Sequence, residues 1–74
     1  MKNIIQFRIY RGEEKYVVEG IDLPIVTQGV SLDEAVSNLR EALLLHFEDE
    51  NLSELGLGPH PVVLVNFELE PLSV

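Results

Sequence analysis

The stretch SLDEAVSNLREALLLHF, from Ser31 to Phe47, decides the fold. Its first four residues form a capping box, in which the Ser31 hydroxyl accepts a hydrogen bond from the Glu34 N–H and the Glu34 carboxylate reaches back to the Ser31 N–H. Apolar residues then recur at spacings of three and four, which indicates a helix that buries one side. The predicted stripe, which should cover one face of a sheet, consists of Leu32, Ala35, Val36, Leu39, Ala42, Leu43, His46 and Phe47.

Three strands are expected before this helix. In the first of them Ile5, Phe7 and Ile9 share one face and alternate with polar residues, which is the pattern of a half-buried strand. A polar turn containing Gly12 joins it to the second strand as a β-hairpin. Pro24 closes the following loop because proline cannot donate to a strand ladder. The three predicted strands span residues 4–11, 15–19 and 25–28.

One further strand is expected after the helix. Residues 51–61 hold two glycines and two prolines and are predicted to form a loop, and residues 62–70 are predicted to form the last strand. A right-handed crossover through the helix then places this strand beside the first strand and parallel to it. The sequence therefore predicts a single α+β domain over residues 1–74, a two-layer βββαβ fold with sheet order 3-2-1-4 and the helix on one face.

The second face of this sheet is expected to lack a helical cover. Scaling with mass gives a folded accessible surface of about 4,600 Å². The free energy gained by burying apolar surface and the free-energy cost of ordering the chain are each roughly 110 kcal/mol and nearly cancel. Because the margin is thin and the chain has no cysteine for a disulfide, we expect a homodimer, a higher oligomer or a partner complex. The apolar residues expected at that contact are Ile4, Val17, Val62 and Leu64.

Charge and residue types narrow the possible functions. Thirteen acidic and five basic residues give a formal net charge of −8, which disfavours direct binding to nucleic acid and favours a basic partner. No stretch approaches the ~20 apolar residues of a membrane span, so a cytoplasmic protein is expected. His46, His60 and the acidic run 48–50 lack the spacing of a metal site. We therefore predict no catalytic residue, no metal and no cofactor.

The segment from Tyr16 to Ala42 resembles the HicB-like antitoxin family. The residues that carry the resemblance are Tyr16 to Pro24, Thr27-Gln28-Gly29, Ser31 to Ala35 and Asn38 to Ala42. The resemblance implies a truncated ribonuclease-H-like fold and the antitoxin half of a type II toxin-antitoxin pair. It implies that Pro24, Thr27, Gln28, Gly29, Ser31 and Glu34 form the structural motif, and that the partner is a small, basic, RNA-cleaving HicA-like toxin whose active surface the antitoxin covers.

Many family members carry a C-terminal DNA-binding segment, and this chain is expected to be a short form without one. No nuclease activity is expected, because the first strand holds no carboxylate for the metal ions of a ribonuclease H. Two alternatives stay open, a stand-alone homo-oligomeric domain of the same fold and a small metal-dependent hydrolase. The residues expected at the protein interface are Ile4, Val17, Val62, Leu64, Asn66 and Glu68.

Overall fold

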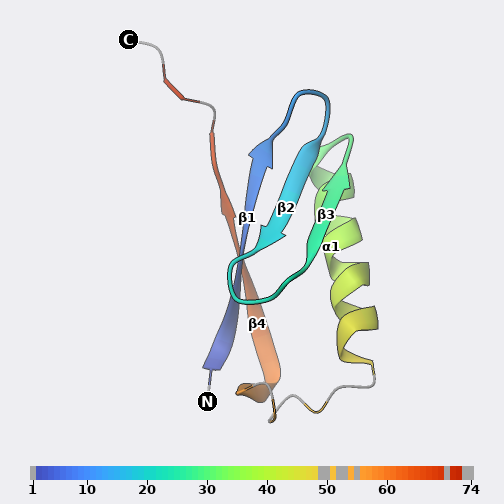
Figure 1. Cartoon of the computed structure of the whole chain (residues 1–74), viewed down its shortest axis with the longest axis vertical. Coiled ribbons are helices and arrows are strands. Elements are labelled where there is room, and N and C mark those ends of the chain that lie inside the picture. Colours follow the sequence, from blue (N-terminus) through green and yellow to red (C-terminus); the bar gives the residue numbers. More distant parts are fainter. Residues whose placement is uncertain (1, 49–50, 52–53, 55, 70, 73–74) are drawn as a thin grey trace.

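A four-stranded sheet carries one helix along one of its faces (Figure 1). The computed structural model describes residues 2–48, 51, 54, 56–69 and 71–72. Strand β4 is parallel to β1, the other pairs are antiparallel, and the strand order is β3-β2-β1-β4. These findings confirm the predicted α+β class, βββαβ order and 3-2-1-4 sheet. The elements are β1 (Lys2–Arg11), β2 (Tyr16–Gly20), β3 (Val26–Gly29), α1 (Leu32–Phe47) and β4 (Leu57–Phe67).

The core lies between the sheet and α1. The alternation predicted for β1 is confirmed, since Ile5, Phe7 and Ile9 are all buried on the helix side. The buried stripe of α1 is narrower than predicted. Leu32 and Val36 belong to the predicted stripe but remain 38% exposed, and the buried residues follow one another at intervals of one helical turn. These buried helix residues are Ala35, Leu39 and Leu43.

Strand β4 begins earlier than the sequence predicts. Residues 57–61 were expected in a loop, yet they belong to β4, and the strand ends at Phe67. A register shift between the pairs Lys2↔Leu57 and Ile4↔Val62 accommodates the extra residues. The predicted last residue of this strand, Glu70, lies outside the described residues. Strands β2 and β3 each begin one residue later than predicted, at Tyr16 and Val26.

Pro61 is compatible with β4 because its nitrogen faces away from β1. The Glu68 N–H donates to the Ile9 carbonyl at 2.8 Å, so the even-numbered backbone groups at this end of β4 point toward β1. Odd-numbered residues, Pro61 included, then direct their backbone groups toward the outer edge. Proline there removes no hydrogen bond from the ladder. The sequence pattern could not show this, because it depends on which neighbour the strand has.

Residues at the end of β3 and in the first turns of α1 dock the helix onto the sheet. The Ser31 hydroxyl accepts a hydrogen bond from the Glu34 N–H at 3.1 Å, as predicted; the reciprocal bond of a capping box is not among those formed by the described residues. The Asn38 amide donates to the Gln28 carbonyl at 2.7 Å. Next to it, Gly29 packs directly on the backbone of Ala35, and the Thr27 hydroxyl is buried on the same strand.

The loop between β2 and β3 turns at Pro24. The Ile25 N–H donates to the Leu23 carbonyl at 2.9 Å, which closes a three-residue turn centred on the proline. The fixed φ of proline suits the central position of such a turn. Directly after it, the Gly20 N–H bonds to the Ile25 carbonyl at 2.8 Å and brings the chain back beside β2. Pro24 therefore has a structural role in this fold.

Replacing Ser31 with Ala is expected to lower the free energy of unfolding by about 1 kcal/mol, because the Glu34 N–H loses its capping acceptor. Ser37→Ala is the matched control. Ser37 is exposed within α1, where alanine has the higher helix propensity, so this variant should be neutral or slightly stabilising. Urea unfolding followed by circular dichroism measures both, and equal losses for the two variants would contradict the role assigned to Ser31.

Candidate protein interface

The sheet face opposite α1 carries an exposed apolar area at one end and a polar area at the other. We call it the open sheet face. The register places Ile4 beside Val62, Gln6 beside Leu64 and Arg8 beside Asn66, and all of these lie on that face by alternation from the buried residues of β1. Its apolar end consists of Ile4, Ile21, Val62 and Leu64, which are 49%, 56%, 60% and 45% exposed. Such a group at the end of a sheet face is typical of a contact surface.

The polar end is organised around Arg8. Its guanidinium lies 3.2 Å from a Glu19 carboxylate oxygen and 3.4 Å from one of Glu68. The same group stacks over the Tyr10 ring, 4.8 Å from its centre. The Asn66 amide donates to the Phe7 carbonyl at 3.1 Å and so reinforces the pairing of β4 with β1. Two carboxylates and one guanidinium give this end a net negative charge.

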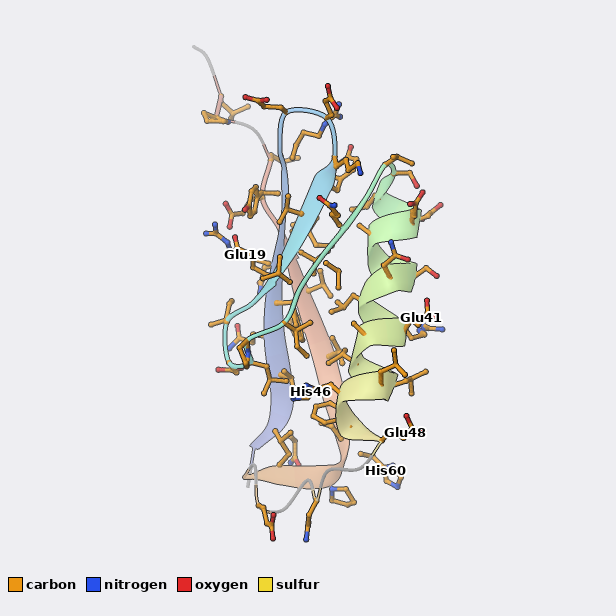
Figure 2. The ribbon with its side chains drawn as sticks, turned by 45° about the vertical axis from the view of Figure 1, so that its right-hand side comes forward. Glu19, Glu41, His46, Glu48 and His60 are labelled. Atoms are coloured by element: carbon orange, nitrogen blue, oxygen red, sulfur yellow. The ribbon has the colours of Figure 1, made fainter. Side chains whose placement is uncertain are left out.

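These contacts shift the ionisation of three side chains. A hydrogen bond from the Tyr10 hydroxyl, with further help from Arg8, lowers the pKa of Glu19. The same hydrogen bond to Glu19 raises the pKa of Tyr10, and the hydrogen bond of Arg8 with Glu19 raises the pKa of Arg8. Glu19 is thus held in its charged form at the centre of the polar end. Figure 2 shows it on the side of the sheet away from α1.

Tyr10→Phe and Arg8→Gln are each expected to raise the pKa of Glu19, because each removes a donor to its carboxylate. A lowered folded-state pKa means that Glu19 stabilises the protein above its unfolded pKa and that this contribution disappears as the pH falls through the folded value. An NMR titration of the Glu19 side-chain carboxyl measures the shift. An unchanged Glu19 pKa in both variants would contradict the proposed network.

A second surface lies on the helix side, between α1 and β4. Because α1 packs mainly on β3 and β2, it covers the helix side of β4 only in part. A groove of about 610 Å³ results, and its lining is mainly apolar. Arg40 and Glu48 are the charged residues along it. We call it the α1–β4 groove; its lining is Val36, Leu39, Arg40, Leu43, Leu44, Phe47, Glu48, Pro61, Val63 and Val65.

The residues expected at the interface do not form one continuous patch. Ile4, Val62 and Leu64 lie together at the apolar end, whereas Val17 is half-buried and pairs with Tyr10 at the polar end. The polar pair predicted for the interface, Asn66 and Glu68, is already engaged with Phe7 and Arg8, as described above.

Ile21 was missed in the sequence because it was assigned to a loop. Its N–H donates to the Gln6 carbonyl at 2.9 Å, so it extends the alternation of β2 onto the open sheet face. The sequence signal that could have placed Ile21 on this face is its spacing of two residues from Glu19 and four from Val17.

The histidines and acidic residues do not assemble into a metal centre within the described part of the chain. Figure 2 shows Glu48 and His60 at the end of the molecule where α1 stops and β4 starts, and Glu41 on the outer side of α1. His46 packs edge-on against the neighbouring Phe47 ring, 5.3 Å between centres. The rest of the acidic run, Asp49 and Glu50, lies outside the described residues. Among the described helices, none has the length and apolar character needed to cross a membrane.

Comparisons with protein-family models, with curated proteins and with solved structures gave no significant match. The geometry of the two surfaces, together with the charge of the chain, is therefore the basis on which a function is assigned.

Proposed function

We propose that this chain is an antitoxin-like module that binds a small, basic, RNA-cleaving protein of the HicA type in the cytoplasm and blocks its activity. The observation that carries the proposal is the open sheet face, where exposed Ile4, Val62 and Leu64 adjoin a polar end with an excess of carboxylates. Protein interfaces combine an apolar centre with a polar rim. A rim of negative charge favours a basic partner and speeds its association.

The net charge of −8 and the family resemblance support the same assignment. An RNA-cleaving protein needs a basic surface to hold phosphates, and an acidic protein of about the same size can occupy that surface instead of RNA. In this mechanism the apolar end supplies buried contact area, while the net negative charge of the polar end, where Arg8 pairs with Glu19 and Glu68, attracts the basic groups of the toxin. Inhibition follows from occlusion alone and requires no catalytic residue in this chain.

Co-expression with a small basic protein from a neighbouring gene, where the genome encodes one, tests the proposal. A stable complex that no longer cleaves RNA is expected. Leu64→Arg, at the apolar end, should raise the concentration needed for half-inhibition at least tenfold, because it places a positive charge against a basic partner. Leu45→Arg is the matched control, since Leu45 is 67% exposed on α1 and outside both surfaces. It should inhibit as the wild type does.

Circular dichroism must show that both variants are folded. Absence of a complex, or equal inhibition by the two variants, would overturn the proposal.

The alternative of a stand-alone homo-oligomeric domain is supported by the many exposed apolar side chains. It predicts a stable oligomer with no inhibitory activity towards any neighbouring gene product.

A further inference from the structure

Within the described part of the chain, one edge of the sheet is free while the other is covered. At the β3 edge, α1 packs against the strand and Asn38 occupies the Gln28 carbonyl, so a further strand cannot pair there without displacing the helix. At the β4 edge, no described residue bonds to the outward backbone groups of the segment 62–67. In Figure 1, α1 lies beside β3, and the strand order β3-β2-β1-β4 places β4 at the opposite edge of the sheet. An uncovered edge strand is a template for pairing with another chain.

The backbone groups available at this edge belong to Val63, Val65 and Phe67. The hydrogen bond from the Glu68 N–H to the Ile9 carbonyl shows that the even-numbered residues of β4 direct their backbone groups toward β1. The backbone groups of the odd-numbered residues therefore point to the outer edge. Pro61 has no N–H and ends the row on one side. The pairing segment is therefore short, runs from about residue 62 to residue 68, and is centred on Val65.

The free edge carries no acidic or basic side chain between Leu57 and Phe67, apart from His60. Two copies, each with a net charge of −8, repel each other over most of their surfaces. At this strand they can approach without bringing like charges together. Its side chains are apolar on both faces of the sheet: Val62, Val63, Leu64 and Phe67 are each at least 39% exposed.

The isolated chain also exposes more surface than a compact monomer of its mass. Its accessible surface is 5522 Å², against about 4,600 Å² from mass scaling, an excess of about 900 Å². A standard interface buries about 800 Å² on each partner. The radius of gyration, 13.5 Å, likewise exceeds the roughly 11 Å expected for a compact domain of 74 residues. Part of this excess comes from residues that follow β4, where Leu69 and Leu72 are 71% and 82% exposed, and part from the exposed side chains of β4 itself.

We infer that the β4 edge binds a second copy of this chain, through antiparallel β4–β4 pairing with Val65 opposite its own copy. This register sets Val63 opposite Phe67, so that every edge N–H of the three residues finds a carbonyl. It sets Glu68 opposite Val62, and no two carboxylates face each other. On the helix side, Val63, Val65 and Phe67 of both copies form one apolar row that continues the lining of the α1–β4 groove.

Light scattering and sedimentation of the purified chain test the inference. A dimer of twice the 8.3 kDa chain mass is expected at micromolar concentration. Val63→Lys should raise the dimer dissociation constant at least tenfold, because a charged side chain on the edge strand opposes pairing. Val26→Lys is the matched control on β3, where the residue is 67% exposed, and it should leave the constant unchanged. A monomeric wild type, or equal effects of the two variants, would overturn the inference.

Single-cysteine variants test the register, since the chain has no cysteine of its own. Opposed residues of a hydrogen-bonded antiparallel pair have Cα atoms about 5.5 Å apart, within disulfide range. Val65→Cys should therefore form a disulfide-linked dimer on mild oxidation, and Val26→Cys should not. Cross-linking through Val26 rather than Val65 would contradict the assigned edge. These measurements use the chain alone, so their outcome is separate from any test of toxin inhibition.

Discussion

Replacing Phe7 with Ala is expected to lower the free energy of unfolding by about 3–5 kcal/mol, the largest loss of any single substitution considered for this chain. Phe7 is 0% exposed and lies at the centre of β1, between β2 and β4 and beneath α1. Its removal leaves a cavity that the surrounding strands cannot close. A chain of this length has a total stability of roughly 4–11 kcal/mol, so the variant should be largely unfolded at modest urea concentrations.

Phe67→Ala provides the matched control for Phe7→Ala. Phe67 is 46% exposed and contacts the Tyr16 ring, with 6.3 Å between ring centres. Its loss should cost about 1–2 kcal/mol in the monomer. Urea unfolding at low protein concentration measures both variants without a contribution from self-association. Similar losses for the two phenylalanines would show that the helix-side row of β1 is not the centre of the core.

The helix and the first three strands could be predicted from the sequence because their signals are local. Ser31 and the apolar repeat after it define the helix, and the alternation of Ile5, Phe7 and Ile9 defines the inner face of β1. The strand order followed from the handedness of a β–α–β crossover, which holds for nearly all proteins. Each of these inferences uses either the residues of a single helix or strand or a general rule for the connection between consecutive elements.

The early start of β4 and the α1–β4 groove depend on tertiary placement, and the sequence could not reveal them. Pro59 and Pro61 favour a loop by their local preference, and only the position of β4 at an edge makes a strand compatible with Pro61. The groove exists because α1 packs mainly over β3 and β2 and covers β4 only in part. The spacing of the helix residues shows which side is apolar, but not which strand that side covers.

The sheet order and the single helix were predicted correctly, but the division of the open sheet face into an apolar and a polar end was not. Sequence alternation assigns Ile4, Val17, Val62 and Leu64 to one face and carries no information on their order along it. The register between strands separates Val17 from the other three and joins Ile21 to them. Pairing register is therefore the step that converts a list of outward residues into a surface.

Gly29→Ala is expected to lower the free energy of unfolding by about 3 kcal/mol. A methyl group on Gly29 would lie 2.5 Å from the Ala35 nitrogen and 2.8 Å from the Glu34 carbonyl carbon. Both atoms are backbone atoms in the first turn of α1, so no side-chain rotation relieves the contact. The helix must move away from β3, which stretches the Asn38 to Gln28 hydrogen bond as well.

Gly56→Ala separates this packing effect from the general cost of replacing a glycine. Gly56 has a φ of +77°, and a methyl group there meets no atom within 4 Å, so only backbone strain of about 1–2 kcal/mol is expected. A smaller loss for Gly29→Ala than for Gly56→Ala would contradict the close approach of α1. Gly29→Ala should weaken binding of the proposed basic partner only in proportion to the unfolded fraction, whereas Leu64→Arg should weaken it at unchanged stability. That contrast separates the role of Gly29, which docks α1 onto β3, from that of the open sheet face, to which we propose the partner binds.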